Sequence, residues 1–303
     1  MKTLLLTLCA STLIFAADSS RYREDFHYSY PQTAGGRLSL ENFNGSIEIT
    51  GWDQNTVDIS GTKYAESQQL LGEIKIEASS SGNMVQIKTV HPDRNHRGNM
   101  GAKYIIRVPR RTELGDIGSS NGSLKVEDVE GNAHLTTSNG SVRLAKIRGN
   151  VDGHTSNGGV ELTDVLGNVA FHTSNGSINA GNVEGAFEAS TSNGGIRAHL
   201  RDTQGGRAIK LSTSNGAIDL QLDSPRQNEV IASTSNGSIT LRLPGSLNAS
   251  VHASTNSGGS VRSDFDILMR GEISKHRIEG TIGGGGPKLD LTTSNGNIHL
   301  VKI

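Results

Sequence analysis

The sequence predicts an all-β protein built as a right-handed β-solenoid, similar to a parallel β-helix, with coils of about 18–22 residues. Three observations lead to this fold class. The tripeptide Ser-Asn-Gly recurs between residues 120 and 296, apolar residues alternate with polar ones between the recurrences, and no segment between repeats has a helical period. Alternation broken by Gly and Asn is the pattern of short, half-buried strands joined by turns.

The spacing of the repeated asparagine sets the length of each coil. Successive positions differ by 18 over the first four steps, and then by 22 and by 21. The asparagines are Asn121, Asn139, Asn157, Asn175, Asn193, Asn215, Asn236 and Asn295. If each coil stacks about 4.8 Å above the last, each side-chain amide can hydrogen-bond the next and form a structural ladder.

The four consecutive units 123–140, 141–158, 159–176 and 177–194 show which side chains face inward. Positions 2, 4, 7, 11 and 13 of each unit are mostly apolar, so we expect them to form the core. The threonine at position 15, just before Ser-Asn-Gly, falls on the same inward side. Positions 3, 12 and 14 are varied and charged, as a solvated face would be.

A second architecture also fits these repeats. Asn-Gly between alternating strands is typical of a β-hairpin, and a series of hairpins would give an antiparallel meander. Asn and Gly tolerate positive φ better than other residues, so we expect Asn-Gly to serve a sharp positive-φ turn in either arrangement. A meander needs only that this turn be permissive. It does not explain why threonine also recurs before the turn. The stacked coil explains both repeats, so we favour it.

Residues 1–17 have the pattern of a secretory signal peptide, with one lysine, an apolar run and then small residues near Ala16 and Ala17. The apolar run is shorter than the roughly 20 residues that span a membrane. Cys9, the only cysteine, follows Leu8 rather than a small residue, which argues against lipidation. The mature chain then has no thiol, which excludes disulfides and cysteine chemistry. We expect a periplasmic, cell-surface or secreted location.

Composition excludes several classes of function. The 29 Lys and Arg nearly balance the 30 Asp and Glu, and no basic block suggests nucleic-acid binding. The run Gly283–Gly286 lacks the Lys-Ser/Thr and the helix of a phosphate loop, so a turn is expected there. No glycine-rich calcium-binding nonapeptide is present. The repeated threonine points inward, which argues against ice binding. We expect no cofactor.

Position 6 of the units is the first candidate for chemistry, because it stacks Asp128, Lys146, Asp164 and Asn182. Paired carboxylates on neighbouring coils are what a polysaccharide-cleaving enzyme needs. Lys146 stands between the two aspartates and is expected to pair with both. We therefore interpret this column as a surface ion-pair stripe without catalytic residues.

Histidines and aromatic residues give two further candidates. His154 and His172 should stack about 5 Å apart and could hold zinc or copper, but Thr136 and Ser190 continue the column and are poor ligands. A metal-free histidine pair is therefore expected, although His134 lies nearby. The aromatic residues near the N-terminus either bind sugar or cover the open first coil, and we favour the cover. They are Trp52, Tyr22, Tyr28 and Tyr30.

Four stretches, 35–63, 102–124, 244–261 and 282–303, carry a family resemblance that extends over about residues 33–303. With the serial Thr-Ser-Asn-Gly motif, the chain resembles the bacterial putative-adhesin family of unknown function, which has the Toastrack-type stacked β-coil fold. This divides the chain into the signal peptide, a capping segment at 18–32 and the solenoid at 33–303. Regular coils begin at about residue 105, and residues 264–280 could form an excursion.

The resemblance implies a domain outside the cytoplasmic membrane and transfers no catalytic or metal-binding residue. The sequence thus predicts a non-enzymatic envelope or secreted interaction protein, in the sense of an adhesin, whose partner is an unknown envelope protein or a surface glycan. One alternative, also implied by the resemblance, is an envelope-stress accessory domain that binds another envelope protein. A β-helix enzyme acting on polysaccharide is the third.

Overall fold

The computed structural model describes residues 22–91, 99–203, 206–256, 258–269 and 274–303. The predicted signal peptide and residues 18–21 of the predicted capping segment lie outside this part. Among the helices of the described residues, none combines the length and the apolar character needed to cross a membrane.

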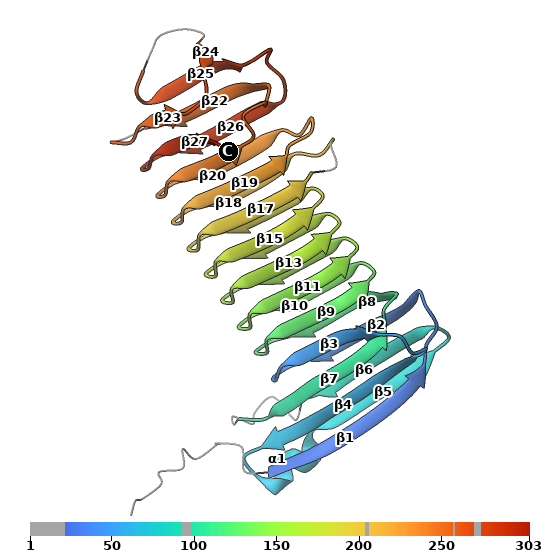
Figure 1. The fold of residues 1–303 in the computed structure, drawn as a ribbon. Coiled ribbons are helices and arrows are strands. Elements are labelled where there is room, and N and C mark those ends of the chain that lie inside the picture. Colours follow the sequence, from blue (N-terminus) through green and yellow to red (C-terminus); the bar gives the residue numbers. More distant parts are fainter. Residues whose placement is uncertain (1–21, 92–98, 204–205, 257, 270–273) are drawn as a thin grey trace, which may run out of the picture.

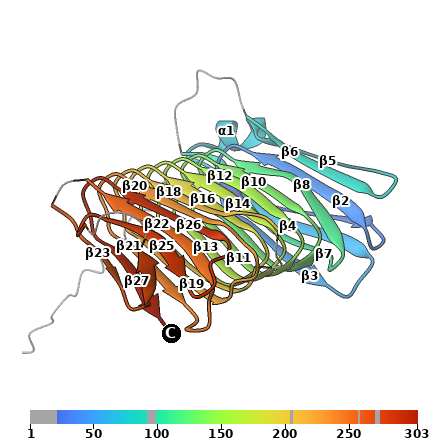
Figure 2. The same cartoon turned by 90° about the horizontal axis from the view of Figure 1, so that it is seen from above.

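The described strands form two long sheets that run side by side along the molecule (Figures 1 and 2). Sheet A consists, in spatial order, of β1 (Tyr22–Pro31), β4 (Thr56–Ala65), β7 (Gly101–Pro109), β3 (Ile47–Trp52), β9 (Leu124–Glu130), β11 (Val142–Arg148), β13 (Val160–Leu166), β15 (Ile178–Glu184), β17 (Ile196–Asp202), β19 (Ile218–Ser224), β21 (Ile239–Leu243), β27 (Ile298–Lys302) and β23 (Val261–Ser263).

Sheet B consists, in the same direction, of β5 (Lys75–Ser81), β6 (Met84–Val90), β2 (Gly36–Asn42), β8 (Thr112–Ser119), β10 (Ala133–Thr137), β12 (Val151–Thr155), β14 (Val169–Thr173), β16 (Phe187–Thr191), β18 (Ile209–Thr213), β20 (Val230–Thr234), β26 (Lys288–Thr293), β22 (Ala249–Thr255), β25 (Arg277–Ile282) and β24 (Ile267–Met269). The chain alternates between the two sheets in the regular region, so that one strand of each makes a coil.

Neighbouring coils pair in parallel, as the stacked arrangement requires. Val142 pairs with Val160 in sheet A, and Thr137 pairs with Thr155 in sheet B. The meander would have placed Thr137 and Val142 opposite one another in an antiparallel hairpin. That alternative is wrong.

The core lies between the sheets and contains the side chains that the sequence placed there. Positions 2, 4, 7, 11 and 13 of the four units are buried wherever they carry a side chain larger than glycine, and the position-15 threonines are buried with them. At position 13, Phe171 stacks on Gly153 of the preceding coil, where a Cβ would approach the ring to 2.3 Å. The space left by the glycine of one coil thus accommodates the large side chain of the next.

The N-terminal end departs from the coil pattern. β4 is antiparallel to both β1 and β7, and a short helix, α1 (Gln68–Glu73), follows β4. Tyr28 and Tyr30 of β1 pack against the core, as a cover for the first coil should. Trp52 lies further inside the stack on β3, where its ring contacts the Arg107 guanidinium, so it does not cover the end. The sequence analysis did not predict α1.

The spatial order of coils differs from their sequence order at both ends. β3 lies between β7 and β9, and β27 lies between β21 and β23. In sheet B, β26 likewise separates β20 from β22. Within residues 264–280, β24 and part of β25 lie antiparallel to one another beyond β22, so this stretch does leave the regular coil. Gly283 and Gly285 adopt positive φ in the turn expected there.

Candidate functional site

One edge of the stack carries the repeated asparagines in a single row. Each amide nitrogen donates to the amide oxygen of the neighbouring coil, over 2.5–2.9 Å from Asn121 to Asn295, and Asn121 donates in turn to Asn44 at 2.6 Å. Asn44 extends the row by one coil beyond the residues predicted from the sequence. The row is exposed, and every amide oxygen in it from Asn44 to Asn236 accepts a hydrogen bond from the next amide.

The glycine of the repeated tripeptide is required by close approach, not by positive φ. Gly158 and Gly176 do not have positive φ. A Cβ on Gly176 would lie 1.9 Å from the carbonyl oxygen of Gly158 in the preceding coil. The expectation that Asn-Gly serves a positive-φ turn is therefore wrong, and the stacking distance between coils excludes a side chain instead.

The buried threonines secure the same turn from inside. Thr173 Oγ1 donates to the carbonyl oxygen of Gly158 at 3.0 Å and accepts the N–H of Gly176 at 3.2 Å. One hydroxyl thus satisfies a backbone group on each of two coils. A buried polar side chain is stable here because both of its hydrogen bonds are made.

A second asparagine row lies at the start of the sheet B strands, and the sequence analysis missed it. Asn132, Asn150 and Asn168 each follow a glycine and recur with the 18-residue spacing of the first row. Asn150 N–H donates to Asn132 Oδ1 at 2.9 Å, and Asn168 N–H donates to Asn150 Oδ1 at 3.1 Å. The recurrence of asparagine after the second glycine was the available signal.

This second row lines a groove of about 790 Å³ on the outside of the stack. The groove crosses the six strands from β8 to β18 and runs along the stacking axis. Because the strands are about 4.8 Å apart, its length is roughly 24 Å. We call this depression the sheet B groove. Its polar or charged lining residues are Arg37, Glu113, Asn132, His134, Asn150, Asp152, Asn168, Glu188, Arg207 and Lys210.

Acidic side chains in the sheet B groove have partners within the protein. Glu113 accepts the N–H of Asn132 at 2.9 Å, and Asp152 bonds His134 Nδ1 at 2.9 Å. Glu188 lies 4.0 Å from Lys210. Arg37 and Arg207, at opposite ends of the groove, are exposed and make no ion pair within the described residues. The groove therefore has an arginine without an ion pair at each end, while its three acidic and three basic lining side chains balance in formal charge.

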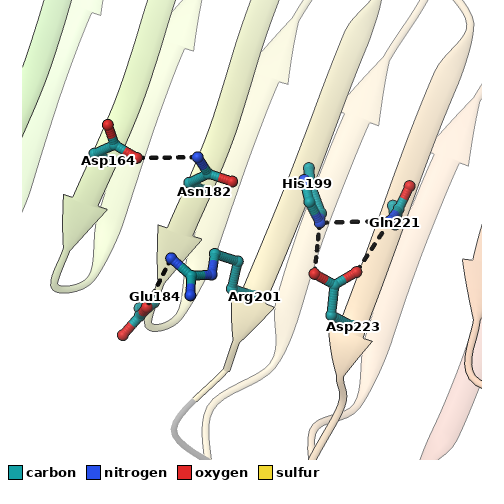
Figure 3. A network of polar contacts seen from close by, with 7 residues as sticks. All are labelled: Asp164, Asn182, Glu184, His199, Arg201, Gln221 and Asp223. Carbon is teal, nitrogen blue, oxygen red and sulfur yellow. Dashed lines mark hydrogen bonds and ion pairs between the residues drawn. The ribbon is translucent and has the colours of Figure 1, made fainter.

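The side chains at position 6 do not form the ion-pair stripe that the sequence predicted. Lys146 lies 3.8 Å from Glu127, while Asp128 pairs with Arg110. Asp164 accepts a hydrogen bond from Asn182 at 3.0 Å, as Figure 3 shows. All four residues of the column have φ between 55° and 64°, a left-handed conformation that Asp and Asn tolerate better than most residues. The expected pairing of Lys146 with both aspartates is wrong, since this local backbone bulge redirects the side chains.

His154 and His172 stack on adjacent coils with ring centroids 5.2 Å apart and ring planes 8° from parallel. His172 Nδ1 also lies 2.7 Å from Ser190 Oγ. His134 bonds Asp152 in the groove instead of joining this pair. In the part of the chain that the structure describes, no three His, Cys, Asp or Glu side chains come together as metal ligands would.

The outer face of sheet A carries a polar network on β17 and β19 (Figure 3). Asp223 bonds His199 Nε2 at 2.7 Å and Gln221 Nε2 at 3.0 Å. Burial acts to raise the pKa of Asp223, but the hydrogen bonds from Gln221 and His199, with the charges of His199 and Arg201, hold that pKa below its usual range. These contacts satisfy the hydrogen-bonding capacity of the Asp223 carboxylate.

Two stacked parallel sheets, closed into coils and joined by one continuous core, define the class of protein as a β-solenoid. The chain belongs to the Toastrack DUF4097 family, whose model matches residues 36–301. The family resemblance inferred from the sequence is therefore confirmed. The family is one of unknown function.

Two solved structures are similar over nearly their whole length. A putative cell adhesion protein from Clostridium sporogenes is 10% identical with a TM-score of 0.25, over 92% of this chain and 100% of that one. A putative adhesin from Bacteroides fragilis is 14% identical with a TM-score of 0.32, over 94% of this chain and 99% of that one. No curated protein matches this sequence.

Proposed function

We propose that this protein is a non-enzymatic interaction protein of the cell envelope or of the secreted fraction, an adhesin in the broad sense. The observation that carries the proposal is the sheet B groove, which crosses six parallel strands on a stiff stack. A groove of this length, open along the axis, suits an extended partner better than a small substrate.

The chemistry of the outer faces supports a role in binding. The candidate carboxylates Asp128 and Asp164 are engaged by Arg110 and Asn182, and Asp223 is engaged by His199 and Gln221. Hydrolysis or elimination would need one group to move a proton and another to stabilise developing charge. The groove presents amides and arginines suited to binding, and its carboxylates Glu113, Asp152 and Glu188 each have a partner within the protein.

The remaining parts of the proposal concern organisation and location. Residues 1–17 direct export, residues 18–32 cap the first coil, and residues 33–303 form the solenoid. Its coils follow the spacing of the repeated asparagines and wind in the right-handed sense. The protein acts in the periplasm, at the cell surface or outside the cell. The repeated asparagines from Asn121 to Asn295 serve structure, and the protein needs no cofactor.

The test is capture of a partner by the immobilised chain lacking residues 1–17. Envelope extract and intact cells are offered separately, and retained protein and carbohydrate are identified. Retention of an envelope component is expected, and recovery of a stress-response envelope protein alone would favour the accessory role. If nothing is retained from either source, the proposed function is wrong.

A parallel assay measures turnover of pectin, alginate and glycosaminoglycan, with and without added calcium or zinc. No turnover is expected, because the carboxylates are engaged by neighbouring side chains. Turnover that disappears in Asp128→Asn or Asp164→Asn would show that the protein is an enzyme.

A further inference from the structure

The geometry points to an acidic, uronate-containing polysaccharide as the ligand of the sheet B groove, bound in an extended conformation along the stacking axis. This inference rests on the proposed function and names the partner of that site. It follows from the free donors of the amides, the two arginines without ion pairs and the direction of the groove.

The amides of the second asparagine row line the groove and are held by their oxygens. Oδ1 of Asn132 and Oδ1 of Asn150 each accept a backbone N–H from the next coil. Within the described residues, Nδ2 of Asn132 and Nδ2 of Asn150 donate no hydrogen bond. Asn168 differs, since its Nδ2 donates to Asn150 Oδ1 at 3.0 Å. Each fixed amide therefore offers donors for the hydroxyl or carboxylate oxygens of a ligand.

The lining of the groove carries three acidic and three basic side chains, and the two arginines at its ends are the groups that suit an anionic ligand. Glu113 and Asp152 each have a hydrogen-bonding partner in the protein, and Glu188 has Lys210 beside it. Arg37 and Arg207 are left to bind carboxylates, and a guanidinium can do so through two parallel hydrogen bonds. Arg37 lies on β2, one strand beyond β8, and Arg207 precedes β18. The two cationic sites are therefore about six strand spacings apart, roughly 29 Å.

The direction of the groove favours a glycan over a peptide. A peptide that gains affinity by adding a strand needs a free sheet edge. Here every strand beneath the groove is paired on both sides, from β8 to β18. Recognition must therefore come from side chains that repeat once per coil. A pyranose unit is about as long as the spacing of about 4.8 Å between strands, so successive sugar units can meet equivalent groups on successive coils.

The experiment titrates the chain lacking residues 1–17 with oligogalacturonates from dimer to octamer, using calorimetry at low and physiological salt. Affinity is expected to rise with length until the oligomer reaches both arginines, at roughly six units for strands about 4.8 Å apart. Arg37→Gln and Arg207→Gln should each weaken the longest oligomer about tenfold, because each removes a charge-assisted hydrogen bond. Neither should alter the binding of a dimer that reaches only the other end.

Matched controls separate binding from folding. Arg143→Gln removes an arginine from the outer face of sheet A, where it bonds Glu161 at 3.2 Å, and should leave affinity unchanged. Asn150→Ala should weaken binding several-fold, and thermal unfolding of each variant verifies that the stack is intact. Equal binding of a neutral cello-oligosaccharide, or tighter binding of polyglutamate, would overturn the assignment of a uronate ligand.

The two proposals can fail separately. If oligogalacturonates do not bind but the chain still retains an envelope component, and Arg37→Gln/Arg207→Gln retains it equally well, the glycan inference is wrong and the interaction function stands. If the chain binds neither, both are wrong.

Discussion

The middle and the ends of this stack are built on different principles. From β9 to β21 in sheet A, strands lie in the order in which the sequence supplies them, and each coil repeats the contacts of the last. At both ends the order is broken and antiparallel strands appear, such as β4 beside β7 and β25 beside β22. A repeat can extend a stack indefinitely, but it cannot end one. Non-repeating sequence has to cover the exposed strands.

The two regions also differ in how a local defect should spread. In the middle, the threonine and asparagine bonds recur in every coil, so the loss of one leaves equivalent bonds on either side. At the ends, unique contacts hold the structure. The Phe26 and Tyr104 rings pack edge to face with their centroids 5.3 Å apart, and β27 is enclosed between β21 and β23. We therefore expect the largest effects where a non-repeated element is removed.

Removal of residues 288–303 should have the largest effect. It deletes β26 and β27, which separate β22 and β23 from the rest of the stack. We expect residues 249–282 to lose protection in hydrogen exchange, with a destabilisation larger than the roughly 4–5 kcal/mol that marks exceptional single mutations. Starting the chain at residue 32 is the comparison, since it removes only the edge strand β1. Equal damage from both deletions would contradict the importance of enclosure.

Phe171→Ala should be the most damaging single substitution in the regular middle. The ring is buried on β14 and stacks on Gly153, so its removal leaves a cavity that no neighbouring side chain fills. We expect a loss of about 3–5 kcal/mol in the free energy of unfolding, measured by denaturant titration. His172→Ala, on the outer face of the same strand, should cost far less. An unchanged midpoint for Phe171→Ala would mean that the inward face is misassigned.

Tyr104 should make the N-terminal end sensitive to high pH. Burial raises the pKa of Tyr104 to about 12, and the hydrogen bond with Thr89 only partly opposes this. Since the unfolded tyrosine ionises near pH 10, stability is fully present below that pH and falls as pH rises toward 12, by at most about 1.4 kcal/mol per pH unit. Tyr104→Phe should flatten the profile between pH 10 and 12. A profile as steep in the variant would contradict this assignment.

Asn157→Ala should have the smallest effect. It removes one donated and one accepted hydrogen bond from an exposed row, which should cost about 0.5–1.5 kcal/mol. Asn179→Ala, exposed on the outer face of β15, is the matched control and should be neutral. Combining Asn157→Ala with Asn175→Ala tests coupling, because the two share a hydrogen bond and the losses should not add. Strict additivity would show that the row is a set of independent contacts.

Much of the middle could be predicted from the sequence because every coil places residues of the same kind at the same buried or exposed position. Val142, Val160 and Ile178 at one position show a buried column more clearly than any single residue does. The parallel pairing followed from the recurrence of threonine, since a hairpin gives no reason for it. The ends have less redundancy. The motif at Thr293–Gly296 marks the coil of β26 and β27, but nothing periodic places this coil before β22 and β23, and the short helix α1 has no periodic signal.

The errors at the candidate sites have a common physical origin. Residue identity at position 6 suggested charge pairing, whereas the backbone at Asp128 and Lys146 is left-handed and turns the side chains toward other partners. Residue identity in the tripeptide suggested positive φ, whereas Gly176 is required by its distance to Gly158. The sheet B groove went unpredicted because Arg37 and Arg207 are far apart in the sequence and meet one surface only after six strands have stacked.

The row of asparagine amides forms a line of aligned dipoles along the stack. Every amide donates toward the N-terminal end of the stack, where the row finishes with Asn44 Nδ2 on the carbonyl oxygen of Met100 at 2.9 Å. At the other end, Asn295 donates to Asn236 and its own Oδ1 accepts no hydrogen bond within the described residues. Amide dipoles aligned head to tail reinforce one another, as peptide dipoles do in a helix. The stack therefore has a satisfied positive pole and an open negative one, and a further amide could extend the row only by donating to Asn295.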